Sequence, residues 1–185
     1  MTFNNIAWSD PVRFWFSEEV RARWFLSTPE FDASIRRQFG GVWEAARRGE
    51  LDHWAEIPEG ALALVIVLDQ FPLNMFRGEA KSFSTEGQAR AIAERVIQAG
   101  WDRQMDDAAR AFLYLPFMHS ESLTDQDRSV ELYRAAGLVD SLRWAEHHRG
   151  IIRRFGRFPH RNEALGREST PEEILWLASE EAFRG

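Results

Sequence analysis

The chain has 185 residues, of which 44% are hydrophobic and 13% aromatic, so it is long enough to bury a core and is unlike a disordered protein. It contains no cysteine, which excludes disulfides, thiolate metal sites and thiol catalysis. The net charge of −6 argues against general nucleic-acid binding, and we expect neither a nucleic acid nor a membrane as a partner.

The compartment is predicted from features that the sequence lacks. The first sixteen residues contain neither the basic segment nor the apolar run of a signal peptide. The longest apolar run, Ala61–Leu68, is far shorter than the roughly 20 residues that a membrane helix needs. Because cysteine is also absent, we expect a soluble protein of the reducing cytoplasm.

Helix-start residues organise the beginning of the chain. Ser9-Asp10-Pro11 and Thr28-Pro29-Glu30 each predict an N-cap followed by proline in the first helical turn. An apolar stripe with a spacing of four residues follows the second start and predicts a long amphipathic helix that ends near Gly49. The stripe consists of Phe31, Ile35, Phe39 and Trp43.

The next segment begins near Pro58 and is apolar on all sides. A run as short and β-branched as Ala61–Leu68 is also compatible with a buried strand. We expect a helix, because the chain offers no second strand-like segment to pair with it. We expect this helix to end at Pro72.

Five further helices are expected in the rest of the chain. Thr85 and Thr124 are the predicted caps of two of them, Pro116 should kink a third, and Thr170 forms a capping box with Glu173. These signals predict an all-α protein with about seven main helices in antiparallel pairs, folded as a single domain over residues 1–185. The five spans are 86–99, 106 to beyond 116, 124–137, 139–155 and 170 onward.

One carboxylate stands out among the apolar segments. Asp69 would lie at the carboxyl end of the most buried helix, where it opposes the helix dipole and needs a cationic partner. We expect Arg77, Arg154 or Arg157 in that role. The pair would either tie two helices together or present a functional carboxylate.

Two histidines are candidates for chemistry. His119 precedes Ser120 and Glu121, so it is either an acid or base tuned by a carboxylate, or a helix-end residue bound to a freed carbonyl. His148 falls on the inward face of its helix and is either a satisfied core residue or a ligand. His119, Glu121 and His148 are therefore the catalytic candidates, and their spacing gives no reason to expect a metal.

Arginine is concentrated near the C-terminus. From Leu142 to Arg167 the chain carries seven arginines and two glutamates, although the whole chain is acidic. Arg157, His160, Arg161 and Asn162 follow the helix stop at Gly156. Their donors would hold a carboxylate or phosphate, or would cap the exposed carbonyls of neighbouring helices.

Several standard chemistries have no motif in the chain. The sequence contains no H-E-x-x-H, phosphate-loop, His-Asp or Gly-x-Ser-x-Gly motif. We therefore expect no zincin, P-loop, metal phosphohydrolase or α/β-hydrolase activity, and we predict no cofactor.

Four stretches together resemble a bacterial family of unknown function, DUF924. The resemblance covers nearly the whole chain and implies a tetratricopeptide-like superhelix of antiparallel helix pairs, with no established reaction, substrate or cofactor. Two positions depart from the family, Leu73 where arginine is common and Gly150 where aspartate is common. The stretches are Leu68–Gly78, Leu113–Glu121, Asp125–Ser129 and Arg154–Thr170, and the matching polar positions are Asp69, Gln70, Asn74, Arg77, His119, Ser120, Glu121, Arg128, His148, Arg157, Arg161 and Asn162.

Our leading hypothesis is a binding module whose polar groove accepts an anionic small molecule or acidic peptide. Arg77, Arg157 and Arg161 would hold the anion, while Asp69 and Glu121 would fix the arginines. Asparagine and histidine side chains would orient the ligand. The predicted ligand-binding residues are Asp69, Asn74, Arg77, His119, Arg128, Arg157, His160, Arg161 and Asn162.

Two alternatives stay open from the sequence. The chain is a hydrolase or transferase that acts on a small anionic substrate, with His119 or His148 as acid or base. Otherwise the polar stretches form a structural network that locks the helices together. The sequence predicts no oligomeric state.

Overall fold

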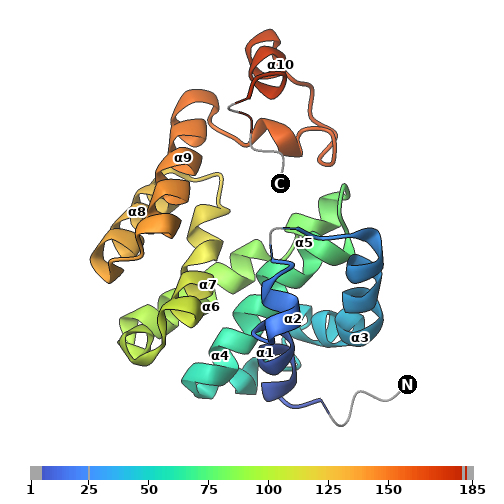
Figure 1. The fold of residues 1–185 in the computed structure, drawn as a ribbon, viewed down its shortest axis with the longest axis vertical. Helices are drawn as coiled ribbons and strands as arrows, with labels where there is room; N and C mark the ends of the chain where they lie inside the picture. The colour runs from blue at the N-terminus through green and yellow to red at the C-terminus, as the bar shows by residue number, and fades with distance from the viewer. Residues whose placement is uncertain (1–5, 25, 181, 183–185) are drawn as a thin grey trace. The chain divides into compact units, whose positions relative to one another are not determined.

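The structure, a computed structural model, describes residues 6–24, 26–180 and 182. Every regular element within these ranges is helical, which confirms the all-α class (Figure 1). In the described ranges no helix is both long and apolar enough to span a bilayer. The tetratricopeptide-like superhelix remains a prediction.

The chain divides into two compact units. The N-terminal unit comprises Met1–Arg77 and Lys81–Pro116, and the C-terminal unit comprises Gly78–Ala80 and Phe117–Gly185. Two compact units are compatible with one folding domain, so the single domain also remains a prediction.

The N-terminal unit contains most of the helices. Its long helix begins where the sequence predicts: Thr28 accepts a hydrogen bond from the backbone N–H of Phe31, and Pro29 follows it. All four residues of the apolar stripe are buried, as expected. The elements of this unit are α1 Ser9–Trp15, α2 Glu18–Arg21, α3 Pro29–Arg47, η1 Asp52–Glu56, α4 Pro58–Val65, η2 Ile66–Gln70, α5 Phe71–Met75, α6 Glu86–Gln98, η4 Trp101–Gln104 and most of α7 Asp107–Met118; η3 Ala80–Phe83 crosses the unit boundary.

The apolar segment after Pro58 is helical throughout, so the helix prediction is confirmed. Its expected end at Pro72 is wrong, because a π-helical turn over Ile66–Gln70 joins α4 to α5. Pro72 has no N–H to donate to the Leu68 carbonyl four residues earlier. A widened turn accommodates this missing bond without ending the helix.

Another residue satisfies the carbonyl that Pro72 leaves open. The Thr85 hydroxyl donates to the Leu68 carbonyl oxygen at 2.5 Å, and the Trp43 indole N–H donates to Thr85 at 3.1 Å. The Thr85 side chain is therefore engaged in the core, and α6 begins at the next residue. Thr85 is the N-cap residue of α6, as predicted, but its side chain makes no capping hydrogen bond.

The C-terminal unit is built around a helical hairpin. Asp127 on α8 pairs with Arg149 on α9 at 3.4 Å, and Arg134 near the end of α8 pairs with Glu146 nearer the start of α9, so the helices are antiparallel (Figure 1). The cap of α8 is Ser122 and not Thr124. The elements of this unit are the end of α7, α8 Leu123–Ala136, α9 Val139–Phe155, η5 Pro159–Arg161 and α10 Pro171–Leu177.

A small apolar cluster lies at the end of α9. Ile151, Ile152, Phe158 and Trp176 are buried together there. Gly156 ends α9 with a φ of +71°, a conformation that glycine adopts without strain. This turn brings Phe158 back onto the inner face of the helix, where its ring is completely buried.

Candidate functional site

The segment between α7 and α8 is held rigidly by its own polar residues. The Ser120 hydroxyl donates to Asp125 at 2.6 Å, and the Gln126 amide donates to the carbonyls of Met118 and Ser120 at 2.6 and 2.7 Å. Gln126 is fully buried. These bonds satisfy carbonyls at the end of α7 and fix the position of the adjacent Glu121.

Glu121 is the anchor of the segment that follows α9. It accepts two hydrogen bonds from the guanidinium of Arg167, at 2.7 and 2.9 Å, and one from the backbone N–H of Phe158 at 2.8 Å. Arg167 also donates to the Asn162 side-chain oxygen at 3.0 Å. Partial burial acts to raise the pKa of Glu121, but the bonds from Arg167 and Phe158 outweigh it and hold that pKa below its usual value.

A second glutamate fixes the other end of this segment. Glu173 forms the predicted capping box with Thr170, and it also accepts two bonds from Arg157, at 2.7 and 2.8 Å. Asn162 donates to the same carboxylate at 3.3 Å. Because of the bonds from Arg157 above all, the pKa of Glu173 falls to about 2.

Three histidines gather around the buried Phe158 ring. The rings of His148 and His160 lie 5.5 and 5.4 Å from it, centre to centre. His119 is close enough to both to affect their pKa values electrostatically. The guanidinium of Arg161, a residue only 5% exposed, lies 4.7 Å from the centre of the Phe158 ring.

Burial keeps two of these histidines neutral. It lowers the pKa of His148 to about 3, against the opposing effect of a bond to the Trp144 carbonyl, and it lowers the pKa of His160 to about 4, with help from Arg161. A carbonyl oxygen only accepts, so the His148 Nδ1, 2.9 Å from it, must carry the proton.

Residues 12–181 match the family described as "Bacterial protein of unknown function (DUF924)". The chain belongs to the DUF924 family. This finding confirms the resemblance drawn from the four sequence stretches. A solved structure of a protein of unknown function from Agrobacterium tumefaciens, ATU0120, is 43% identical to this chain, with a TM-score of 0.87 over 92% of this chain and 96% of that one. No curated protein matches the chain significantly.

Much of the predicted site in this DUF924 chain lies in the C-terminal unit. We use the name Phe158 cluster for the buried ring and the polar residues connected to it. Three of its members, Phe158, Arg167 and Glu173, are not among the predicted site residues, although the predicted capping box includes Glu173. The cluster comprises His119, Glu121, His148, Arg157, Phe158, His160, Arg161, Asn162, Arg167 and Glu173.

The remaining predicted residues lie outside this cluster. Asn74 and Arg77, in the N-terminal unit, both donate to Asp32, at 2.7 and 2.9 Å. Asp69 is fully buried in the π-helical turn and accepts a bond from Gln70 at 2.6 Å. Arg128 is half-buried on α8.

The expected arginine partners of Asp69 are engaged with other carboxylates. Arg77 pairs with Asp32, and the other two pair within the C-terminal unit: Arg154 with Glu172, and Arg157 with Glu173. This expectation was therefore wrong for all three. The sequence indicates that arginines need carboxylates but not which carboxylate each one reaches.

Among the residues that the structure describes, no group of three or more histidine or carboxylate side chains is placed to hold a metal ion.

Proposed function

We propose that this protein is a binding module and that the Phe158 cluster binds a small anion such as phosphate or a carboxylate. The charge balance of the cluster carries this proposal. Three arginines, Arg157, Arg161 and Arg167, face two glutamates, and His148 and His160 are neutral at pH 7. A largely buried excess of one positive charge favours an anion.

Arg161 is the arginine that we assign to the ligand. Arg157 and Arg167 direct their planar guanidinium groups at Glu173 and Glu121. The Arg161 side chain lies against the Phe158 ring with little exposure, which fixes its orientation. His119 and His160 are half-buried and belong to the same cluster, so their rings are available to orient an anion bound by Arg161.

The alternative of a hydrolase or transferase loses one of its two candidate acid–base residues. A histidine with a pKa of about 3 is uncharged at neutral pH, so it is both a poor general acid and a weak base. His148 therefore suits a buried hydrogen-bonding role better than catalysis. The absence of cysteine supports the cytoplasm as the proposed compartment.

A phosphate titration tests the proposal. Binding would be followed by NMR and calorimetry at constant ionic strength, with the parent protein, Arg161→Gln and the control Arg153→Gln. Arg153 is 56% exposed and pairs with Asp127, so it tests a general loss of positive charge. We expect the parent to bind phosphate at millimolar concentration, Arg161→Gln to bind at least about tenfold more weakly, and Arg153→Gln to match the parent.

Thermal unfolding of the same variants separates a site from a structural network. A binding arginine is retained at some cost in stability, so Arg161→Gln should leave the Tm unchanged or raise it. A loss of several degrees, with phosphate shifts absent or equal in all three proteins, would show that the cluster only locks the fold.

A further inference from the structure

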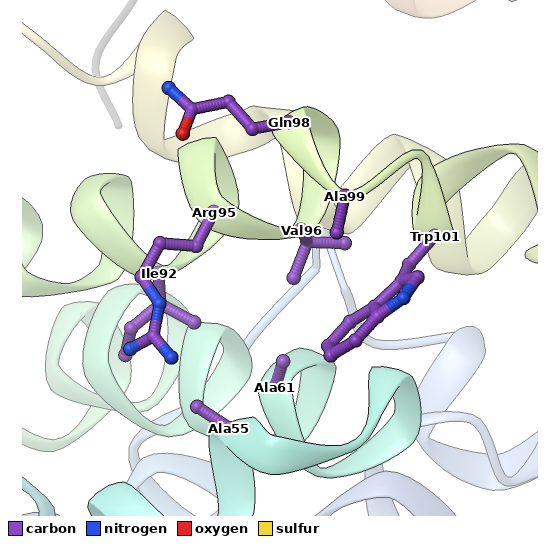
Figure 2. A pocket seen from close by; sticks show the side chains of 8 residues that line it. All are labelled: Ala55, Ala61, Ile92, Arg95, Val96, Gln98, Ala99 and Trp101. Atoms are coloured by element: carbon purple, nitrogen blue, oxygen red, sulfur yellow. The ribbon is translucent and has the colours of Figure 1, made fainter.

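The N-terminal unit contains a pocket that is separate from the Phe158 cluster. It has a volume of about 370 Å³ and lies between α6 on one side and η1 with α4 on the other (Figure 2). Ala55 and Ala61 line one side, and Val96 and Ala99 face them from α6. This volume is at the lower end of the range for small-molecule sites.

A glycine allows the close packing that forms this alanine-lined side. A Cβ at Gly60 would lie 2.1 Å from the Trp54 carbonyl oxygen, so only glycine lets the start of α4 approach η1 this closely. Because the adjacent residues Ala55 and Ala61 are small and buried, the space between them and α6 is not filled by side chains.

Two larger side chains bound the pocket at opposite sides. Figure 2 shows the Trp101 indole extending into the space next to Ala61, while the Arg95 side chain extends beside Ile92 towards Ala55. Both are at least partly exposed, so a ligand can reach them. Within the described part of the chain, Arg95 has no ion-pair or side-chain hydrogen-bond partner.

These features define a ligand of limited size with two different ends. At about 30 Å³ for a water-sized group, the pocket holds roughly a dozen non-hydrogen atoms. The flat indole and the alanine and valine side chains suit an aromatic ring, and the unpaired guanidinium suits a carboxylate. We propose that this pocket binds a small aromatic carboxylate, with its ring on Trp101 and its carboxylate on Arg95.

The position of Arg95 also has an explanation that involves no ligand. Arg95 lies in the last turn of α6, where a cation is favourable because of the helix dipole alone. A role limited to the dipole would change the stability of the protein and would leave ligand binding unaffected. The decisive measurement is therefore affinity, and the Tm serves as the control.

The probe is 2-naphthoate, compared with the uncharged 2-naphthamide of nearly the same shape. Binding to the full chain would be measured by calorimetry and by the NMR shift of the Trp101 indole N–H, which Trp101→Phe identifies. The variants are Arg95→Gln, which removes the charge, and Ala99→Phe, which fills the pocket from an exposed position. Arg103→Gln is the matched control, since Arg103 is exposed, lies two residues after Trp101 and does not line the pocket.

We expect 2-naphthoate to bind at submillimolar to millimolar concentration and to shift the Trp101 signal. Arg95→Gln should weaken it roughly five- to tenfold, to the affinity of 2-naphthamide, and Ala99→Phe should abolish binding. Arg103→Gln and Arg161→Gln should bind as the parent does, which keeps this result independent of the anion site proposed above. The proposal is overturned if the parent shows no saturable binding up to about 10 mM ligand, or if both pocket variants retain the parent affinity.

Discussion

The two units are stabilised in different ways. In the N-terminal unit large apolar side chains fill most of the core, with Trp15, Trp43 and Phe71 at most 1% exposed, and polar residues such as Asp69 and Thr85 are buried among them. In the C-terminal unit, charged and polar side chains such as Glu173 and Asn162 are as buried as the apolar residues around Phe158. Apolar packing depends little on pH, whereas a network of ionised and neutral groups holds only while each group keeps its protonation state. We therefore expect the stability of the C-terminal unit to depend on pH more strongly than that of the N-terminal unit.

Lowering the pH should produce the largest difference in stability between the two units. Burial lowers the pKa of His148 and His160 from 6.5 to about 3 and about 4 in the folded protein. These histidines therefore bind protons at a higher pH in the unfolded chain than in the folded one, and the stability falls as the pH drops below about 6.5. The stabilisation from the lowered pKa of Glu173 is complete above about 4.5 and is lost as the pH falls towards about 2. In the N-terminal unit, hydrogen bonds from Arg77 outweigh burial and lower the pKa of Asp32, but that contribution is lost only below about 3.8.

The indole N–H signals of tryptophan would report this difference by NMR. Trp176 lies in the apolar cluster of the C-terminal unit, and Trp43 lies in the N-terminal core. We expect the Trp176 signal to lose its folded shift between about pH 6 and pH 4 while the Trp43 signal persists. Loss of both signals with one midpoint would show that the units do not differ in this way.

The next largest effect on stability should come from removing a carboxylate that pairs with an arginine, one in each unit. Glu173→Ala removes the capping box and leaves Arg157 without its carboxylate, and we expect a cost of about 2–3 kcal/mol. Asp32→Ala should cost about 1 kcal/mol, because its partner Arg77 is 52% exposed and water replaces much of the pair. Thermal unfolding followed by circular dichroism would show a Tm loss of roughly 5–10 °C for the first variant.

The neighbouring residue is the control for this comparison. Glu172 pairs with Arg154, but its side chain is 61% exposed, so Glu172→Ala should change the Tm little. Equal losses of Tm for Glu172→Ala and Glu173→Ala would mean that only the negative charge in the first turn of α10 matters. The buried hydrogen bonds of Glu173 would then add nothing to the stability.

A smaller effect is expected from packing in the N-terminal unit. Gly60→Ala would force the start of α4 away from the Trp54 carbonyl and should cost about 1–3 kcal/mol. Gly40→Ala, in the interior of α3, meets no atom within 4 Å and should be neutral or stabilising. If Gly60→Ala retains the parent Tm, α4 and η1 can move apart at no cost in stability, and their close contact is not a constraint on the fold.

The local signals in the sequence predicted most of the helices. The boundaries of α3 and α9 and the capping box of α10 follow from caps, glycines and apolar spacing that act within a few residues. The helix through Pro72 was missed, because the group that satisfies Leu68 is Thr85, which follows it by 17 residues. Only the folded chain brings these residues together.

The same limit applies to the candidate site. The stretches around His119 and His160 are both rich in polar residues, and Glu121 joins them through its bonds from Phe158 and Arg167. The partner of each arginine could not be predicted, because the pair between Glu121 and Arg167 spans 46 residues. Spacing along one helix therefore cannot show which arginine each glutamate engages.

The smallest predicted effect is on α9, at Gly150. Gly150 is exposed in the middle of the helix, and a Cβ there would meet no atom within 4 Å. Gly150→Ala should stabilise the C-terminal unit by about 0.5–1 kcal/mol, because glycine costs backbone entropy in a helix interior. Gly156→Ala is the matched control and should destabilise, since its φ of +71° strains any other residue. Thermal unfolding of both variants would measure these opposite signs. A loss of stability in Gly150→Ala would mean that something else occupies the surface beside Gly150, and that the glycine at this position serves that contact.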